Sequence, residues 1–355
     1  MNKNALLKLL ASNKRKKDWN LDLSGREITK LPPEIGELRH LERLQLGENK
    51  LSTLPKEITK LQKLRILFLC GNRFTKVPEE VIQLKSLNCL NLRGNYITSL
   101  PRNFHKGSKL ERIVLSYNPL NKFPSGLLNI PTIESLLLER TGLKYIPAGI
   151  KDLKKLKWLN LGGNPFKRFP NVIFEFPDLK QLYLDNLQLK QFPLGIFNLK
   201  KLRFLGLEKN DLKSIPSGLG SLKKVISLNL GGNRLSKLPS DFDDLKSLQS
   251  LHLNNNCFIE FPKVIARLRK LRGLWFDWNR IQELPPEISN MAGLRFLHLV
   301  GNELISLPNE ITKLKELEEI HLDHNPFPQF PENIILEERA SVVLRYVSRN
   351  LKKFD

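Results

Sequence analysis

The chain has 355 residues, of which 41% are hydrophobic, and 58 Lys and Arg stand against 36 Asp and Glu, giving a formal net charge of +22. This composition supports a substantial folded core, and no apolar run approaches the ~18 residues that a transmembrane helix needs. The three cysteines form no CxxC pair and do not cluster at the ends, which argues against a disulfide-capped extracellular protein.

The N-terminal segment, residues 1–17, reads MNKNALLKLLASNKRKK. It resembles a secretion signal only superficially, because Lys8 interrupts its short apolar part and a basic cluster follows where a cleavage site should lie. We therefore predict a helical cap over residues 1–17, with its helix over residues 4–12. No signal peptide is evident, which favours a cytoplasmic location over a secreted or surface-exposed one.

Residues 18–336 contain fourteen tandem repeats of 23 residues with the template LxxLxLxxNxLxxLPxxIxxLxx and no insertion. The fifteenth position is proline in every repeat. The ninth position is asparagine in eleven repeats and departs from it at Arg26, Thr141 and Leu187. The repeats begin at Asp18, Leu41, Leu64, Leu87, Leu110, Ile133, Leu156, Leu179, Leu202, Val225, Leu248, Leu271, Leu294 and Leu317.

The pattern itself predicts stacked parallel strands. The two leucines of each LxL point to the same side of a strand, and one repeat cannot bury them alone, so stacking must create the core. Asparagine amides at a 23-residue spacing can satisfy buried backbone groups. Thr141 can perform part of this role, whereas we expect a local irregularity at Leu187. The proline blocks further strand pairing, so the segments that follow it should be short 3₁₀ or helical turns.

On these motifs the chain resembles the leucine-rich repeat family in its 23-residue LPxxI bacterial form. It is similar to small spirochaetal leucine-rich repeat proteins and to the arrays of the Ras group and of Roco proteins. The resemblance implies an α/β repeat solenoid: a right-handed horseshoe with a concave parallel sheet, short 3₁₀ or helical turns on its convex side, and use in protein recognition.

The last segment, residues 337–355, is predicted to form a C-terminal helical cap over the open edge of the sheet. Ala340, Val343, Leu344 and Val347 follow helical spacing there. Nothing in the chain has the composition of a linker, so we predict one domain.

The sequence lacks a P-loop, a GxGxxG fingerprint, HExxH, a GxSxG elbow and metal-type cysteine spacing. We therefore predict no enzymatic activity and no cofactor, and we expect function to reside in exposed repeat positions. Positions 3, 5, 7 and 8 should face the concave side, and neighbouring repeats should place equivalent residues in contact.

Two apolar groups occupy these positions. The central group is Val114, Tyr117, Leu137, Trp158, Tyr183 and Phe204, and the C-terminal group is His252, Trp275, Trp278, Phe296, His298, His321 and His324. One interpretation is that the aromatic residues only stiffen the sheet. We favour a partner-binding surface, because tryptophan and tyrosine are frequent hot-spot residues.

Two further interpretations stay open. His298 and His321 should lie on adjacent strands with Asp323 on the same face, where they could hold a divalent metal, although a polar recognition surface explains the imidazoles more simply. Lys144, Lys167, Lys190 and Lys213 occupy the twelfth position of four successive repeats. They form either a solvated rim or a track for a polyanionic polysaccharide or other acidic surface. No motif indicates specific nucleic-acid binding.

The sequence therefore predicts a non-enzymatic scaffold that binds a macromolecular partner, foremost a protein, on its concave face. Polyanion binding is the first alternative and a metal site at the histidines is the second.

Overall fold

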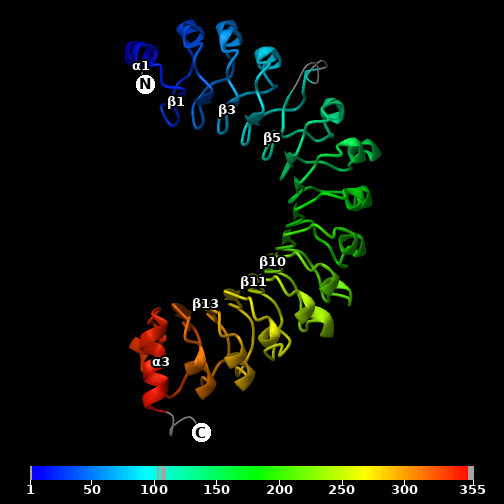
Figure 1. Cartoon of the computed structure of the whole chain (residues 1–355), viewed down its shortest axis with the longest axis vertical. Helices are drawn as coiled ribbons and strands as arrows, with labels where there is room; N and C mark the ends of the chain where they lie inside the picture. The colour runs from blue at the N-terminus through cyan, green and yellow to red at the C-terminus, as the bar shows by residue number, and fades with distance from the viewer. Residues whose placement is uncertain (1, 102–103, 105–108, 351–355) are drawn as a thin grey trace. The chain divides into compact units, whose positions relative to one another are not determined.

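The structure is a computed structural model that describes residues 2–101, 104 and 109–350. The chain divides into two compact units, Met1–Leu179 and Lys180–Asp355, here called unit 1 and unit 2. Each unit consists of repeats with one short strand on one side and a short helical turn on the other (Figure 1).

Unit 1 begins with helix α1 (Lys3–Lys16), and its described strands then pair in parallel in sequence order. Equivalent residues of successive repeats face each other, as Leu21 faces Leu44. The strands are β1 (Asn20–Asp22), β2 (Arg43–Gln45), β3 (Ile66–Phe68), β4 (Cys89–Asn91), β5 (Arg112–Val114), β6 (Ser135–Leu137) and β7 (Trp158–Asn160). The 3₁₀ helices are η1 (Pro33–Glu37), η2 (Lys56–Lys60), η3 (Glu79–Gln83), η4 (Ser125–Asn129), η5 (Ala148–Asp152) and η6 (Asn171–Glu175).

Unit 2 repeats this arrangement with the same 23-residue register. Its strands are β8 (Gln181–Tyr183), β9 (Phe204–Gly206), β10 (Ser227–Asn229), β11 (Ser250–His252), β12 (Gly273–Trp275), β13 (Phe296–His298) and β14 (Glu319–His321). Its helices are η7 (Leu194–Asn198), η8 (Leu219–Ser221), η9 (Ser240–Asp244), η10 (Ile265–Arg267), η11 (Pro286–Asn290), η12 (Asn309–Lys313), α2 (Glu332–Ile335) and α3 (Ala340–Arg349).

The repeat proline opens the turn on the side opposite the strands. In η2 the carbonyl of Pro55 accepts a hydrogen bond from the N–H of Ile58 at 3.0 Å, and the carbonyl of Ile58 accepts one from Leu61 at 3.0 Å. Ile58 and Leu61 are both fully buried. A residue that cannot donate to a strand ladder thus starts the 3₁₀ turn that closes the core, as the sequence predicts.

The asparagine ladder joins each repeat to the one before it. The Nδ2 of Asn164 donates to the carbonyls of Leu138 and Leu161, both at 2.8 Å, and its Oδ1 accepts from the N–H of Leu143 at 3.0 Å. One side chain therefore satisfies polar backbone groups of two successive repeats inside the apolar core. Thr141 performs part of this role as predicted, because its hydroxyl donates to the carbonyl of Leu138 at 2.8 Å.

The three repeats that lack this asparagine share a backbone irregularity. At Leu187 the irregularity was expected, and the structure shows it as a left-handed conformation at the next residue, Gln188, with φ of 56°. The same conformation follows the other two departures, at Glu27 with φ of 56° and at Gly142 with φ of 74°. Without the amide, the turn therefore takes a second left-handed residue to complete its path.

Helices lie at both ends of the chain. In α1, Leu6 and Leu10 are buried, and the side chain of Asn2 caps the helix by accepting from the N–H of Ala5 at 2.9 Å. The helix extends from Lys3 to Lys16, further than the predicted residues 4–12. No helix among residues 2–101, 104 and 109–350 is long and apolar enough to cross a bilayer.

The C-terminal segment covers the edge of β14. The N–H of Ile320 donates to the carbonyl of Glu338 at 2.9 Å, and the N–H of Ala340 donates to the carbonyl of Glu318 at 3.0 Å. Ala340, Val343 and Val347 are fully buried in α3. This segment forms hydrogen bonds with backbone groups that an open sheet edge would otherwise expose. The last residues of the predicted cap, 351–355, lie outside the described part of the chain.

Candidate partner-binding surface

The strand face is defined here as the surface formed by repeat positions 3, 5, 7 and 8, which the sequence analysis assigned to the concave side. In unit 2 it carries four stacked rings from β11 to β14, the ring column His252, Trp275, His298 and His321. Ring centroids are 4.1 Å apart between His252 and Trp275, 5.5 Å between Trp275 and His298, and 4.2 Å between His298 and His321. The predicted lateral contact at position 5 is therefore present in this unit.

A second pair of rings lies beside the column. Trp278 stacks on His324 with centroids 5.7 Å apart, although these residues belong to repeats 12 and 14. Gly301 occupies the equivalent position of the repeat between them, and a Cβ there would overlap the indole of Trp278. A glycine thus opens the space that the indole fills, and 52% of Trp278 remains exposed.

The left-handed backbone of this pair belongs to position 8, which has it in every repeat. Trp278 and His324 adopt left-handed conformations with φ of 53° and 57°, and Tyr117 in unit 1 does so with φ of 58°. At this position other repeats carry glycine, such as Gly94 with φ of 65°, or a non-aromatic residue, such as Glu48 with φ of 52°. A left-handed residue with a Cβ costs about 1 kcal/mol or more. The three aromatic side chains therefore occupy positions where glycine is the less strained residue.

Two imidazoles of the ring column, His252 and His298, are less basic than an ordinary histidine. Burial lowers the pKa of His252, and burial together with the neighbouring His321 lowers the pKa of His298 to about 4. Burial also raises the pKa of Asp277, whose Oδ1 accepts a hydrogen bond from the N–H of Val300 at 2.8 Å. At physiological pH the column therefore presents uncharged imidazoles at His252 and His298, on either side of the indole of Trp275.

The two histidines considered for a metal lie on neighbouring strands, since His298 faces His321 in the register of β13 and β14. The third group that the structure places with them is Glu319, and the possible ligand atoms of these three residues lie within 4.8 Å of one another. Among the described residues, Asp323 belongs to no such group. Glu319 is two residues before His321, so strand alternation was the signal that could have identified it.

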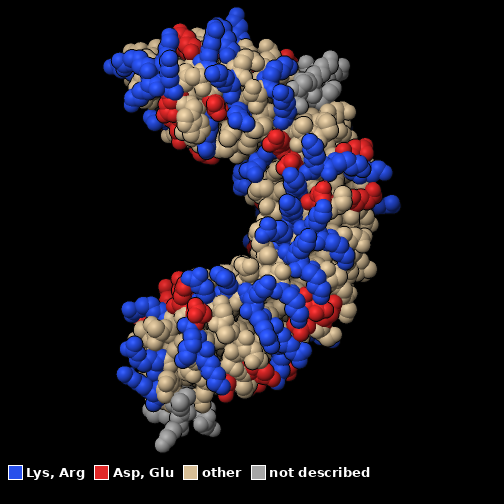
Figure 2. Space-filling model, in the orientation of Figure 1, with Lys and Arg blue, Asp and Glu red and all other residues tan. Residues whose placement is uncertain are grey.

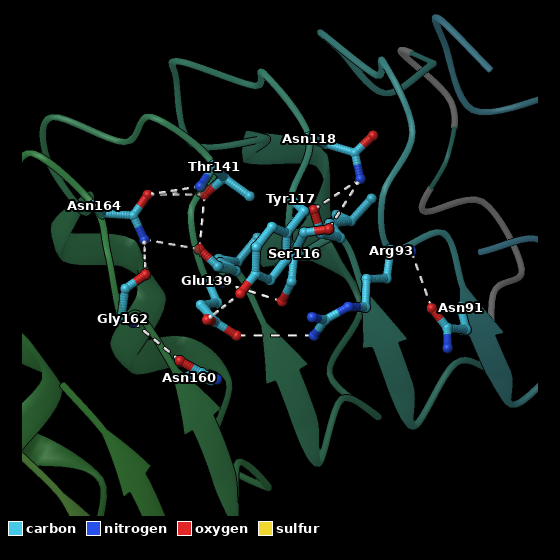
Figure 3. A network of polar contacts seen from close by, with 12 residues as sticks. Asn91, Arg93, Ser116, Tyr117, Asn118, Glu139, Thr141, Asn160, Gly162 and Asn164 are labelled. Atoms are coloured by element: carbon cyan, nitrogen blue, oxygen red, sulfur yellow. Dashed lines mark hydrogen bonds and ion pairs between the residues drawn. The ribbon is translucent and has the colours of Figure 1, made fainter. Parts of the chain in front are cut away.

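In unit 1 the strand face has a different chemistry, centred on Tyr117 (Figure 3). The guanidinium of Arg93 lies 4.2 Å from the ring centroid of Tyr117, and that of Arg140 lies 5.8 Å from it. The hydroxyl of Tyr117 donates to Oε1 of Glu139 at 2.8 Å, while Nη1 of Arg93 lies 3.9 Å from its Oε2. Cation–π contacts and an ion pair hold this ring.

The remaining residues of the predicted central group are less exposed than expected. Val114 is buried, which leaves it little surface for a partner, and Leu137, Trp158, Tyr183 and Phe204 are half-buried. The guanidinium of Arg112 lies 5.3 Å from the ring of Trp158. The group also divides between the units, since Tyr183 and Phe204 belong to unit 2. Phe296 of the C-terminal group is half-buried beside Glu319 in the strand register.

The lysines at position 12 are all exposed. Lys144 and Lys167 are neighbours in unit 1, where the N–H of Lys167 donates to the carbonyl of Lys144 at 3.1 Å. Figure 2 shows basic side chains spread over the visible surface of both units, with acidic ones gathered in smaller groups between them. This distribution agrees with a basic rim and does not single out the four lysines.

Sequence reasoning missed one groove in unit 2, which has a mixed polar and apolar lining and lies away from the strand face. Ile259 and Ile305, which are more than half exposed, lie at its rim at position 12 of their repeats, and Phe261 and Pro285 line it. The same repeat position thus carries lysines from repeat 6 to repeat 9 and isoleucines in repeats 11 and 13. The change from lysine to isoleucine at position 12 was the sequence signal that could have indicated this groove.

Models of known families match two stretches of the chain. A leucine-rich repeat model matches residues 20–74 and 62–120, and a model of leucine-rich repeat regions matches residues 193–277. No curated protein matches the chain.

Three solved structures illustrate its likeness to known folds. A leucine-rich repeat protein of Leptospira interrogans is 37% identical over 84% of this chain and 76% of its own, with a TM-score of 0.76. An internalin, InlF, of Listeria monocytogenes is 20% identical over 91% and 88%, with a TM-score of 0.63. The ectodomain of the Arabidopsis thaliana receptor kinase GASSHO1/SCHENGEN3, solved in complex with CASPARIAN STRIP INTEGRITY FACTOR 2, is 27% identical over 86% and 44%, with a TM-score of 0.51. The parallel strands, asparagine ladder and 3₁₀ turns, together with the Leptospira relative, place this chain in the leucine-rich repeat family.

Proposed function

We propose that the chain is a non-enzymatic scaffold that binds a protein partner on its strand face, with the rings of unit 2 as the main anchor. The fold is that of a protein-interaction scaffold. The observation that carries the proposal is Trp278: the residue is half exposed, and its indole is stacked on His324 in the space that Gly301 leaves open.

Binding by this surface would cost little ordering. Trp275 is already stacked between His252 and His298, and Trp278 is stacked on His324, so neither ring needs to be immobilised when a partner arrives. A preformed site avoids part of the entropy lost on association. The GASSHO1/SCHENGEN3 ectodomain supports the idea that such arrays take a protein ligand.

The aromatic surface of unit 2 also separates this proposal from polyanion binding. An acidic polysaccharide would be attracted by exposed lysines such as Lys144 and Lys167, and salt would weaken that attraction steeply. A partner anchored on indole rings would depend on apolar burial and would be far less sensitive to salt. We therefore place protein binding first and retain the polyanion as the alternative outcome.

The test begins with affinity capture by the intact chain from extracts, followed by calorimetry with each protein identified. We expect Trp278→Ala and Trp275→Ala each to weaken binding by about 2 kcal/mol or more, the scale of hot-spot truncations. Tyr145→Ala is the matched control, because Tyr145 is 56% exposed against 52% for Trp278 and lies outside the strand-face positions. Far-UV circular dichroism should be unchanged in all three.

Two results would contradict the proposal. Equal affinity of the tryptophan variants and wild type would place the partner elsewhere on the molecule. Binding that is lost in moderate salt, and abolished by changing Lys144, Lys167, Lys190 and Lys213 to glutamine, would establish the polyanion alternative instead.

A further inference from the structure

We propose that His298, Glu319 and His321 form a binding site for a divalent transition-metal ion on the strand face of unit 2. The inference does not depend on the proposed partner site. It rests on the placement of three ligand groups, on a shielded imidazole nitrogen, and on the carboxylates that surround it.

The first step is convergence. Parallel pairing of β13 with β14 sets His298 opposite His321, and the rings stack with centroids 4.2 Å apart and planes 18° apart. Glu319 projects to the same side as His321, because residues two apart on a strand share a face. As a result, one ligand atom from each of the three residues lies within 4.8 Å of the other two.

The second step concerns Nε2 of His321. This nitrogen is shielded from solvent and, within the described part of the chain, makes no hydrogen bond. Its neighbour Oε2 of Glu319 is 3.7 Å away, beyond hydrogen-bonding distance. A shielded polar atom without a partner is costly. Two ligand atoms on one tetrahedral zinc ion, each about 2.0–2.1 Å from it, are about 3.4 Å apart, so the observed separation is close to what a shared ion requires.

The third step concerns the surroundings of the site. Oε1 of Glu338 lies 4.0 Å from Nδ1 of His321, on the other nitrogen of that ring. The hydrogen bond from Ile320 to the carbonyl of Glu338 fixes this segment beside β14. At this distance the Glu338 carboxylate makes no hydrogen bond to the ring, but it adds a second negative charge beside the site. Two carboxylates, Glu319 and Glu338, also make the surroundings favourable to a cation.

The ligand set indicates the class of metal. Two imidazoles and one carboxylate suit zinc, nickel, copper or iron better than magnesium or calcium, which prefer oxygen ligands alone. Three protein ligands leave the remaining coordination position for water.

The experiment uses the full chain, treated with chelator and dialysed, and titrated with ZnCl₂ in a calorimeter. We expect one site per chain, and at least a ten-fold loss of affinity in His321→Gln and in Glu319→Gln. Glu319 is half exposed, so its variant should fold normally even if His321→Gln perturbs the column. The matched control is His324→Gln, which removes an exposed histidine of the same repeat outside the cluster and should leave the affinity unchanged.

Titration with Co²⁺ supplies an independent reading of the ligands. Ligation by nitrogen and oxygen gives visible d–d bands without the thiolate charge-transfer absorption expected if Cys70, Cys89 or Cys257 took the ion. Thiolate absorption, affinity in Glu319→Gln equal to that of wild type, or no zinc bound by the wild-type chain would each overturn the proposal.

Discussion

The strand faces of the two units use the same repeat positions for different chemistry. In unit 1 Tyr117 lies under Arg93 and donates to Glu139, so charged groups hold the ring. In unit 2 Trp278 lies over Gly301 and stacks on the ring of His324. Both residues occupy position 8 and share a left-handed backbone. The repeat thus fixes where a side chain projects, while its neighbours decide which interactions it makes.

This difference has an energetic consequence. The groups around Tyr117 are partly exposed, with Arg93 at 51% and Glu139 at 27%, and ion pairs of this kind contribute little and weaken with salt. Aromatic stacking adds about 0.5–1.5 kcal/mol for each pair beyond the area it buries, and does not depend on salt. We therefore expect the unit 2 surface to be the more rigid of the two.

The largest effect on the free energy of unfolding is expected in unit 1, when Asn118 beside Tyr117 is replaced with leucine. Asn118 donates to the carbonyls of Leu92 and Leu115, both at 2.9 Å, and accepts from the N–H of Ile97 at 2.9 Å. Each buried group left unpaired costs about 1–3 kcal/mol. Asn118→Leu should therefore destabilise the chain by about 3 kcal/mol or more in urea unfolding, with loss of the adjacent Tyr117 network and unchanged emission from the unit 2 tryptophans.

Leu187→Asn is the matched control for that variant. Repeat 8 already folds with leucine at this position, and its turn passes through left-handed residues Asn186 and Gln188. Restoring the amide should change the free energy of unfolding by no more than about 1 kcal/mol, in the stabilising direction. If Leu187→Asn lowered the free energy of unfolding as much as Asn118→Leu, the asparagine ladder would stabilise the chain through packing volume and not through its hydrogen bonds.

A smaller effect should appear when Gly301 is replaced by alanine. The new Cβ would overlap the indole of Trp278, and the backbone there has φ of 64°. Gly94→Ala is the matched control, since its φ is 65° but the nearest atom to its Cβ would be 3.7 Å away. We expect a cost of about 1 kcal/mol for Gly94→Ala from the left-handed backbone alone.

Gly301→Ala should cost about 2 kcal/mol or more, since displacing the indole adds to the same backbone strain. It should also increase quenching of tryptophan emission by a soluble quencher, which Gly94→Ala should not. Equal costs and equal quenching would show that the indole adjusts freely, and the idea that Gly301 builds the ring surface would be wrong.

The sequence predicts the elements of this fold because its pattern is local and repeated. Each LxL sets a strand, each proline opens a 3₁₀ turn, and each asparagine joins neighbouring repeats, so fourteen copies support one interpretation. The candidate site was harder, because its geometry depends on particular neighbours. The stack of His298 on His321 follows from register alone, whereas the span of Trp278 across a whole repeat to His324 depends on the missing side chain of Gly301.

Two residues of the candidate site were predicted wrongly from the sequence, each for its own reason. Val114 occupies a strand-face position and was expected to be exposed, but it is buried, and its solvent access depends on packing that periodicity does not encode. Glu319 was not predicted, although alternation along β14 places it on the same face as His321, whereas Asp323 lies outside the cluster. Position in a repeat therefore predicts direction well and solvent access only in part.

The smallest expected effect is a shift in the titration midpoint of His252, which tests whether the stacked rings of unit 2 shield one another from water. Burial lowers the pKa of this imidazole, one face of which is covered by the indole of Trp275 at 4.1 Å. Its titration midpoint, followed by NMR, should therefore lie below the ~6.5 of an unperturbed histidine. Trp275→Ala should raise that midpoint, because water then reaches the ring and favours the charged form. A histidine whose pKa is lower in the folded state contributes stability above pH ~6.5 that is lost as the pH falls through the folded value. Acid should accordingly destabilise wild type slightly more than His252→Gln over this range. If Trp275→Ala left the midpoint unchanged, the indole would not shield His252, and the lowered pKa of this histidine would have another cause.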